Sequence, residues 1–206
     1  MHIISGKYRG RKLQTPQDEA TRPSTGQVRE ALFNICQTYI DESDFLDLFA
    51  GSGAIGLEAL SRGASSATFV DNHRESLRCI QQNIEHIGAK PKEAQALYGD
   101  VFAVMDKLAR QGNTYAIIYA DPPYHTIHVV KGIEDSYSNH VIKHVDEGSL
   151  LLPNGVLFIE DDGEAPEYSR PLKTLELKSS RRMGRSMLKQ YIKREKHEEN
   201  AINGDL

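Results

Sequence analysis

The stretch DLFAGSGAIGLEAL (47–60) carries three glycines between an apolar run and a helix-like segment. Residues 45–49 predict a strand, and residues 54–62 predict a helix that ends at Gly63. The three glycines permit a tight turn, a close approach of the backbone to a ligand, and close packing of the helix on the sheet. They are Gly51, Gly53 and Gly56. The order strand, glycine turn, helix predicts a loop that binds a nucleoside cofactor, and a tight turn without a ligand is the plain structural alternative.

Strand and helix patterns alternate along the rest of the chain. Further strands are expected in the apolar runs SATFV (66–70), AQALY (94–98), YAIIYA (115–120) and VLFIE (156–160). Helices are expected at 28–35, 73–87 and 101–110. This alternation predicts an α/β fold whose mostly parallel sheet is covered on both faces. Near the end of the chain, LKTLELKSS and SMLKQYIKRE are joined by RRMGR (181–185), which predicts an antiparallel hairpin at the sheet edge.

The length of 206 residues favours a single domain, 1–206, with one substantial core. Residues 1–25 extend it as a basic N-terminal arm, in which IISGKYRGRKLQ predicts a short hairpin or an extended segment. Cys36 and Cys79 lie far apart on apolar helix phases, so we interpret them as reduced core thiols. With no signal peptide pattern and no apolar run long enough to span a bilayer, the sequence predicts a cytoplasmic protein that is not bound to a membrane.

The charges are distributed unevenly, although the net charge is only −4. Residues 1–30 hold six Lys/Arg against three Asp/Glu, residues 169–196 hold ten against two, and residues 31–168 hold nine against 21. Basic ends around an acidic centre favour a body that binds a small cofactor while its edges contact phosphates, and solvated basic faces are the alternative. The predicted phosphate contacts are Lys7, Arg9, Arg11, Lys12, Arg22, Arg181, Arg182 and Arg185.

Three aspartates follow successive predicted strands or end them: Asp47, Asp71 and Asp100. Carboxyl ends of parallel strands are where open α/β sheets bind ligands. We expect Asp47 to favour a cationic ligand, Asp71 to accept hydrogen bonds from ribose hydroxyls, and Asp100 to accept one from an adenine amino group. The glycine spacing and Asp71 also satisfy the dinucleotide fingerprint, so an NAD-dependent oxidoreductase remains an alternative.

The fourth strand is followed by Asp121-Pro122-Pro123-Tyr124. The two prolines stiffen the backbone and remove two N–H donors, which leaves a platform rich in acceptors. The Asp121 carboxylate and a backbone carbonyl can accept both hydrogens of an exocyclic NH₂ group, and Tyr124 offers a face on which a base stacks. We therefore predict that Asp121, Pro122, Pro123 and Tyr124 are the catalytic segment, the alternative being a rigid turn. The nearby histidines, His125, His128, His140 and His144, lack a completing acid or cysteine, so we predict no metal and assign them to a polar surface.

Together, DLFAGSGAIGLEALSRG, FVD, YGDV and DPPY, preceded by TRPSTGQVREALFNI and an RGRKL arm, resemble the bacterial 16S ribosomal RNA guanine-N2 methyltransferases of the guanine-966 type. The resemblance covers nearly the whole chain, and the chain departs from it at Gly26 and Gln27, where relatives often have an acid followed by a basic residue.

The resemblance implies a Rossmann-like, class I methyltransferase fold with seven strands and S-adenosylmethionine as cofactor. It implies transfer of a methyl group to the N2 amino group of a guanine in 16S rRNA, within an assembled or assembling small ribosomal subunit. We further expect a monomer. The predicted cofactor-binding residues are Asp47, Phe49, Ala50, Gly51, Ser52, Gly53, Asp71, Asn72, Asp100 and Val101. A DNA adenine-N6 methyltransferase and a non-catalytic RNA-binding module remain alternatives.

Overall fold

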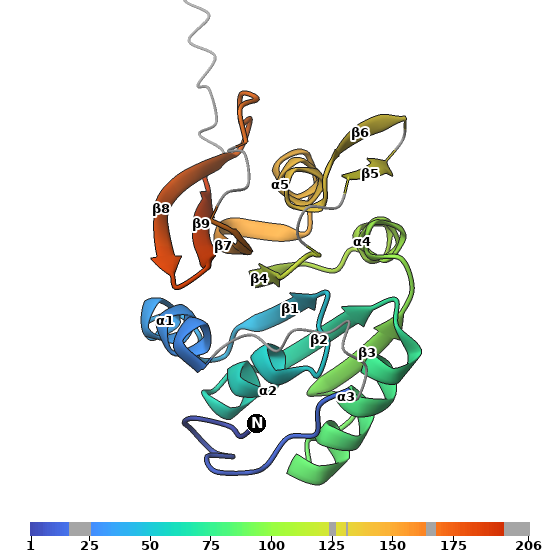
Figure 1. Cartoon of the computed structure of the whole chain (residues 1–206), viewed down its shortest axis with the longest axis vertical. Helices are drawn as coiled ribbons and strands as arrows, with labels where there is room; N and C mark the ends of the chain where they lie inside the picture. The colour runs from blue at the N-terminus through green and yellow to red at the C-terminus, as the bar shows by residue number, and fades with distance from the viewer. Residues whose placement is uncertain (17–25, 124–126, 131, 164–167, 196–206) are drawn as a thin grey trace, which may run out of the picture.

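The centre of the computed structural model is a seven-stranded sheet (Figure 1). The structure describes residues 1–16, 26–123, 127–130, 132–163 and 168–195. The strands lie in the order β3 (Ala94–Tyr98), β2 (Ser66–Asp71), β1 (Asp44–Leu48), β4 (Tyr115–Ala120), β7 (Leu151–Asp162), β9 (Ser186–Lys193) and β8 (Leu175–Met183).

Five neighbouring strands, β3, β2, β1, β4 and β7, are parallel, whereas β9 is antiparallel to both β7 and β8. The predicted mostly parallel sheet and the C-terminal hairpin are therefore confirmed. The hairpin differs in one detail: β8 continues to Met183, so Arg181 and Arg182 lie in the strand and not in the turn. β7 also begins earlier than expected, because a bulge opposite Tyr115 and Ile117 admits Pro153 to Gly155 into the strand.

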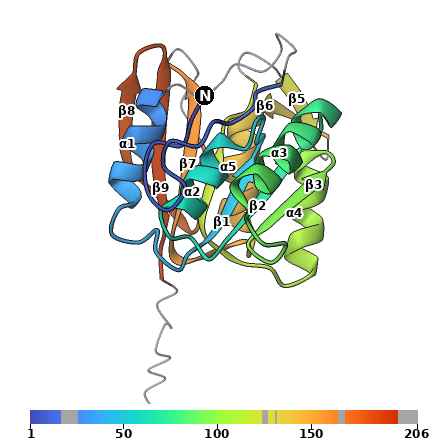
Figure 2. The same cartoon turned by 90° about the horizontal axis from the view of Figure 1, so that it is seen from below.

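Helices cover both faces of the sheet. They are α1 (Gly26–Cys36), α2 (Ala54–Ser61), α3 (Arg74–Ile87), α4 (Val101–Arg110) and α5 (Tyr137–Glu147). Side chains of one strand alternate between the faces, so Phe45 packs in the core cluster that includes residues of α1, α2 and α3, whereas Leu46 packs in the cluster that includes residues of α4 and α5. Figure 2 shows α1, α2 and α3 in front of the sheet. None of the helices among the described residues is long and apolar enough to cross a membrane.

The segment after the fourth strand contains three elements that the sequence did not predict. A two-stranded antiparallel sheet is formed by β5 (Ile127–Val130) and β6 (Ile133–Ser136), and α5 follows it directly. Ser136 caps α5, because its side chain accepts a hydrogen bond from the backbone N–H of Asn139. Four-residue strands carry too little periodicity to be recognised in a sequence that is mostly polar around them.

Within residues 1–16, the N-terminal arm forms a hairpin-like loop that is closed by an antiparallel bridge between His2 and Lys12. Ile3, Tyr8 and Leu13 are buried, so the arm contributes to the core. The arm is held by α2, over which it passes in Figure 2. The fully buried carboxylate of Glu58 accepts hydrogen bonds from the backbone N–H groups of Ile4 and Ser5, at 2.7 and 2.9 Å.

Candidate active site

The strand register brings the predicted site residues to one edge of the sheet. Leu48 at the end of β1 pairs with Val70 on one side and Ala120 on the other, and Asp71 pairs with Tyr98. The segments that follow these strands therefore begin side by side at the carboxyl ends. This edge lies at the switch point of the strand order, where β1 has β2 on one side and β4 on the other.

The glycine loop between β1 and α2 has the backbone that its sequence requires. Phe49, Gly51 and Gly53 all have positive φ values, of 58°, 54° and 75°, and the Gly53 N–H donates to the Ala50 carbonyl at 2.7 Å. A Cβ atom on Gly51 would meet nothing within 4 Å, so space for a ligand lies beside this residue. A Cβ atom on Gly56 would lie 2.3 Å from the ring of Phe69, which confirms that this glycine packs the helix on the sheet.

Asp47 lies beneath this loop and is only 1% exposed. Its Oδ2 accepts a hydrogen bond from the backbone N–H of Gly56 at 2.9 Å, at the start of α2. Burial raises the pKa of Asp47 well above its ordinary value, and the charges of Asp121 and Asp71 raise it further. Asp47 is thus a buried acceptor behind the loop whose ionised form a nearby cation would favour, and a direct contact with a cofactor stays a prediction.

Asp71 at the end of β2 orders the loop. Its Oδ2 accepts from the Gly51 N–H and its Oδ1 from the His73 N–H, both at 2.8 Å. Burial raises its pKa, although both hydrogen bonds oppose that shift. Each carboxylate oxygen has a second lone pair, so these bonds leave acceptor capacity for ribose hydroxyls. The neighbouring Asn72, also a predicted contact, is exposed at the same edge.

Asp100 follows β3 and is exposed, and its Oδ1 accepts from the Ala103 N–H at 3.0 Å, which makes it the N-cap of α4. Val101 behind it is buried in the core. Tyr137 of α5 lies close enough to Asp100 that its phenol pKa is raised by burial first and by this carboxylate second. Asp100 thus combines the capping role with a position at the ligand edge.

The catalytic segment begins directly after β4. The backbone N–H of Asp121 lies 3.5 Å from the Leu48 carbonyl, which ties the segment to the end of β1. Asp121 is half-buried, Pro122 is buried and Pro123 is exposed, while Tyr124 lies outside the described residues. Asp121 follows Ala120, which pairs with Leu48, so it lies near the strand end that carries Asp47, and its charge raises the pKa of Asp47.

An aromatic cluster that the sequence analysis missed lies beside this edge. The ring of Tyr137 stacks on His128 at 4.5 Å between centroids, lies parallel to Phe102 at 6.1 Å, and meets Phe49 edge-on at 5.7 Å. Assigning the histidines to a polar surface was wrong for His140, which is buried and bonds to the His128 carbonyl at 2.8 Å. The missed signal is the helical spacing of Tyr137, His140 and His144, which places all three on one face of α5.

His144 likewise lies partly buried, with its Nε2 3.1 Å from a carboxylate oxygen of Asp106. His125 is outside the described residues. In the part of the chain that the structure describes, no group of three or more His, Cys, Asp or Glu side chains is arranged to hold a metal ion.

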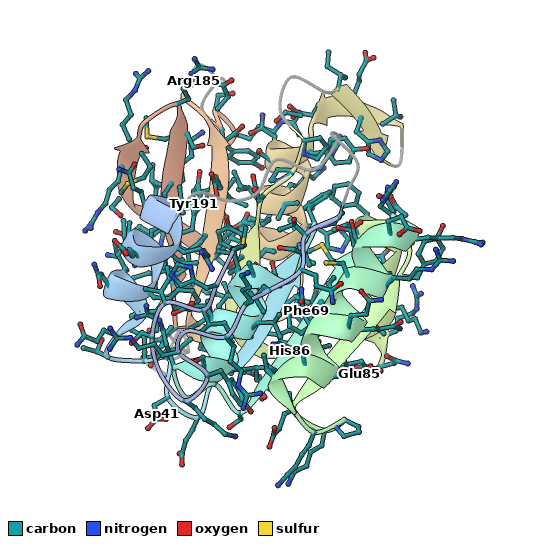
Figure 3. All side chains as sticks on the ribbon, turned by 60° about the horizontal axis from the view of Figure 1, so that its bottom comes forward. Asp41, Phe69, Glu85, His86, Arg185 and Tyr191 are labelled. Atoms are coloured by element: carbon teal, nitrogen blue, oxygen red, sulfur yellow. The ribbon has the colours of Figure 1, made fainter. Side chains whose placement is uncertain are left out.

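The C-terminal basic residues lie at the same edge as the site. Asp162 at the end of β7 pairs with Ser186, and the Gly163 N–H donates to the Arg185 carbonyl at 3.1 Å. Figure 3 shows Arg185 at the end of the β8–β9 hairpin, opposite Asp41, which precedes β1. Arg181, Arg182 and Arg185 are all exposed.

The arm places its basic residues at the other end of the molecule. Arg11 donates to the carbonyl of His86 near the C-terminal end of α3, where Figure 3 labels His86. Lys7 and Arg11 both lie over the ring of Tyr8, at 4.8 and 5.6 Å. Arg9 and Lys12 are exposed. Arg22 lies outside the described residues. Among the predicted phosphate contacts that the structure describes, the hairpin arginines lie at the carboxyl edge and the arm cations do not.

Comparisons with known proteins agree with this geometry. A family model described as conserved hypothetical protein 95 matches residues 1–192. Ribosomal RNA small subunit methyltransferase D of Escherichia coli strain K12 is 33% identical over 164 residues, which cover 80% of this chain and 76% of that protein.

Two solved structures have the same fold. A putative methyltransferase yhhF from Escherichia coli superposes with a TM-score of 0.76 and 28% identity, covering 94% of this chain and 98% of that one. A putative methyltransferase complexed with SAH superposes with a TM-score of 0.64 and 20% identity, covering 81% of this chain and 48% of that one. The chain therefore belongs to the family described as conserved hypothetical protein 95, has the Rossmann-like methyltransferase fold, and is a methyltransferase related to ribosomal RNA small subunit methyltransferase D.

Proposed function

We propose that this protein uses S-adenosylmethionine to methylate the exocyclic N2 amino group of a guanine in 16S rRNA. The observation that carries the proposal is the edge at which the glycine loop and the Asp121-Pro122 segment begin side by side, next to Asp47 and Asp71. The family relationship supports the RNA substrate, because the Escherichia coli relative is named for the small-subunit ribosomal RNA.

The electrostatics of the loop favour a cationic cofactor. Asp47, Asp71 and Asp121 gather three carboxyl groups around the glycine loop. Burial is the first cause that raises the pKa of Asp47 and of Asp71, and for Asp47 the charges of Asp121 and Asp71 raise it further. A sulfonium and an ammonium group relieve this repulsion, whereas the pyrophosphate of NAD would add to it. The charge distribution therefore favours S-adenosylmethionine over the dinucleotide alternative.

The residues fit the cofactor in three ways. Space beside Gly51 admits a ligand close to the backbone, Asp71 retains acceptor capacity for the ribose, and Asp100 offers an acceptor at the end of β3. When bound, S-adenosylmethionine supplies the methyl group as an electrophile. The protein holds the acceptor nitrogen in line, and this positioning accounts for much of the rate gain.

Asp121 and the Pro122 carbonyl would hold the amine. The lone pair of an aromatic amine is delocalised into the ring, so two acceptors on its hydrogens both orient the nitrogen and increase its electron density. Tyr124 follows directly and would stack on the base, which has to be unstacked from its neighbours to reach the site. The target guanine would be presented this way by the folded RNA.

The proposal includes the setting of the reaction. Arg181, Arg182 and Arg185 lie at the same edge as Asp121 and would contact phosphates beside the target. The arm cations lie at the C-terminal ends of α2 and α3, away from the site. Phosphate contacts at both places need a substrate much larger than a short RNA hairpin, such as a small ribosomal subunit. We propose a cytoplasmic, monomeric enzyme built from the single domain 1–206, in keeping with its two free, buried cysteines.

The deciding experiment uses labelled S-adenosylmethionine with small ribosomal subunits that lack the modification. Label on the N2 atom of one 16S guanine is the expected result, and nuclease mapping identifies the position. Parallel reactions contain free 16S rRNA and duplex DNA. Transfer to adenine in DNA, with none to RNA, would replace the proposal by the adenine-N6 alternative. If the protein binds the cofactor but transfers no methyl group to any of the three substrates, the non-catalytic RNA-binding module is left.

A further inference from the structure

Asn83 of α3 is a completely buried polar side chain whose amide is fully engaged. Its Oδ1 accepts a hydrogen bond from the backbone N–H of Gln14 at 2.8 Å. Its Nδ2 donates to the Gln14 carbonyl and to the Ser52 carbonyl, both at 3.0 Å. The side chain therefore joins two segments that are far apart in the sequence.

The two segments have different tasks. Gln14 belongs to the arm, directly after the buried Leu13, and its carbonyl is also 3.1 Å from the Cys79 thiol. Ser52 is the central residue of the glycine loop, between Gly51 and Gly53. In the same loop, the Gly51 N–H donates a hydrogen bond to the Asp71 carboxylate. Asn83 and Asp71 thus fix the loop from two directions.

A loop built on glycines needs such restraints, because glycine loses more conformational freedom on folding than any other residue. The buried Asn83 amide would be left without a partner if the Ser52 carbonyl turned away, which is costly, so it favours one orientation of the Ser52 peptide. Under the proposed function, that peptide is part of the loop that would meet the cofactor. The orientation of Asn83 is itself fixed by the two backbone groups of Gln14.

We propose that Asn83 is a positioning residue for cofactor binding, which holds the glycine loop in its binding conformation by anchoring Ser52 to the docked arm. The inference rests on the assignment of the glycine loop to S-adenosylmethionine under the proposed function. The arm, in this view, supports the cofactor site as well as carrying basic residues. Asn83 itself touches neither the cofactor nor the RNA.

The test compares Asn83→Ala with Ser61→Ala. Ser61 also anchors the arm, because its hydroxyl donates to the Ser5 carbonyl and accepts from the Tyr8 N–H, but its side chain makes no hydrogen bond to the loop. Calorimetry with S-adenosylmethionine and no RNA measures the Kd, and thermal unfolding measures stability. Asn83→Ala should weaken binding about tenfold, and Ser61→Ala should stay within about twofold of the wild type, even at a similar loss of Tm.

A second variant, Asn83→Ser, covers the case in which the alanine variant does not fold. A hydroxyl has one hydrogen, so it cannot serve both carbonyls, and we expect a smaller but measurable rise in Kd and in the KM for S-adenosylmethionine, with kcat at saturating cofactor near the wild-type value.

The proposal is overturned if a folded Asn83 variant binds S-adenosylmethionine with the wild-type Kd. It is also overturned if Asn83→Ser and Ser61→Ala, compared at equal Tm, change the Kd equally. Since the calorimetry contains no RNA, failure of the RNA activity leaves this result standing. Failure of the wild type to bind S-adenosylmethionine would overturn both.

Discussion

At the scale of single residues, Asp47 is an ionisable side chain in a position where burial opposes its charge. Its pKa is raised well above its ordinary value, chiefly by burial, so the folded state holds the proton more tightly than the unfolded state does. Stability is therefore lost as pH rises from the unfolded value through the raised folded value. Asp47→Asn keeps an acceptor for the Gly56 N–H and removes the charge.

We expect Asp47→Asn to be more stable than the wild type, with a difference that grows as pH rises. Denaturant unfolding of both proteins without cofactor, between about pH 5 and pH 8, measures this difference. The same variant should bind S-adenosylmethionine more weakly, because an amide, unlike the carboxyl, cannot ionise to balance a cationic ligand. A stability difference that stays constant with pH would show that Asp47 does not titrate with folding.

Asp71→Ala should weaken S-adenosylmethionine binding by about tenfold or more, because hydrogen bonds to charged groups contribute roughly 1.5–3 kcal/mol and the Gly51 N–H also loses its partner. Calorimetry on the folded variant measures the loss. Asp44→Ala is the matched control: Asp44 lies at the opposite end of β1, is exposed and bonds to Ser66. Equal affinity of the Asp71 variant and the control would remove Asp71 from the cofactor site.

Asp121→Ala should lower turnover about 10²-fold or more while leaving RNA affinity nearly unchanged, because most RNA affinity comes from phosphate contacts. Single-turnover methylation and RNA binding are measured on the same preparation, after cofactor titration has shown that the loop is intact. In the same assay Tyr124→Phe keeps the ring and should remain active, whereas Tyr124→Ala loses stacking of about 1–3 kcal/mol. Wild-type turnover by Asp121→Ala would defeat the catalytic assignment.

At the scale of elements, the β8–β9 hairpin and the arm are both basic but lie at different ends of the sheet. Replacing Arg181, Arg182 and Arg185 together by Ala should weaken RNA binding and make it less dependent on salt. The slope of log binding constant against log salt concentration should fall by about 0.7–0.9 for each phosphate that the variant no longer neutralises. Filter binding over a salt series measures the slope.

The arm triple variant, with Arg9, Arg11 and Lys12 neutralised, should also flatten the slope for the whole small subunit while sparing cofactor binding. For a short RNA that contains only the target region, the arm variant should bind like the wild type, because α3 alone is about 20 Å long and separates the arm cations from the site. An unaltered slope in both triple variants would identify all six residues as solvated surface charges.

At the scale of the whole molecule, cofactor binding should stabilise the fold by mass action. At a concentration of 100 Kd, S-adenosylmethionine adds about 2.7 kcal/mol, which corresponds to a rise in Tm of roughly 5–10 °C for a chain of this size. Thermal unfolding with and without ligand measures the shift, and NAD at the same concentration is the control. A rise with NAD and none with S-adenosylmethionine would restore the oxidoreductase alternative.

The sequence by itself determined the features that depend on local geometry. Gly51 and Gly53 lie in the positive-φ turn that their spacing predicted, a conformation that favours glycine. Gly56 packs on Phe69, where a Cβ atom would lie 2.3 Å from the ring. The apolar runs became parallel strands because their side chains are buried on both faces. Asp121 and Pro122 follow a predicted strand, so their place at its carboxyl end was also predictable.

Only the tertiary structure decided which distant residues meet. Asp71 holds the Gly51 N–H, and Asn83 joins Gln14 to Ser52, through contacts between segments that no sequence period connects. The basic charges were visible in the sequence, but the strand order put Arg185 at the edge of the site and the path of the arm put Arg11 beside His86. The physical reason is that propensity and periodicity act over a few residues, whereas strand order and buried hydrogen bonds are fixed by the packing of the whole chain.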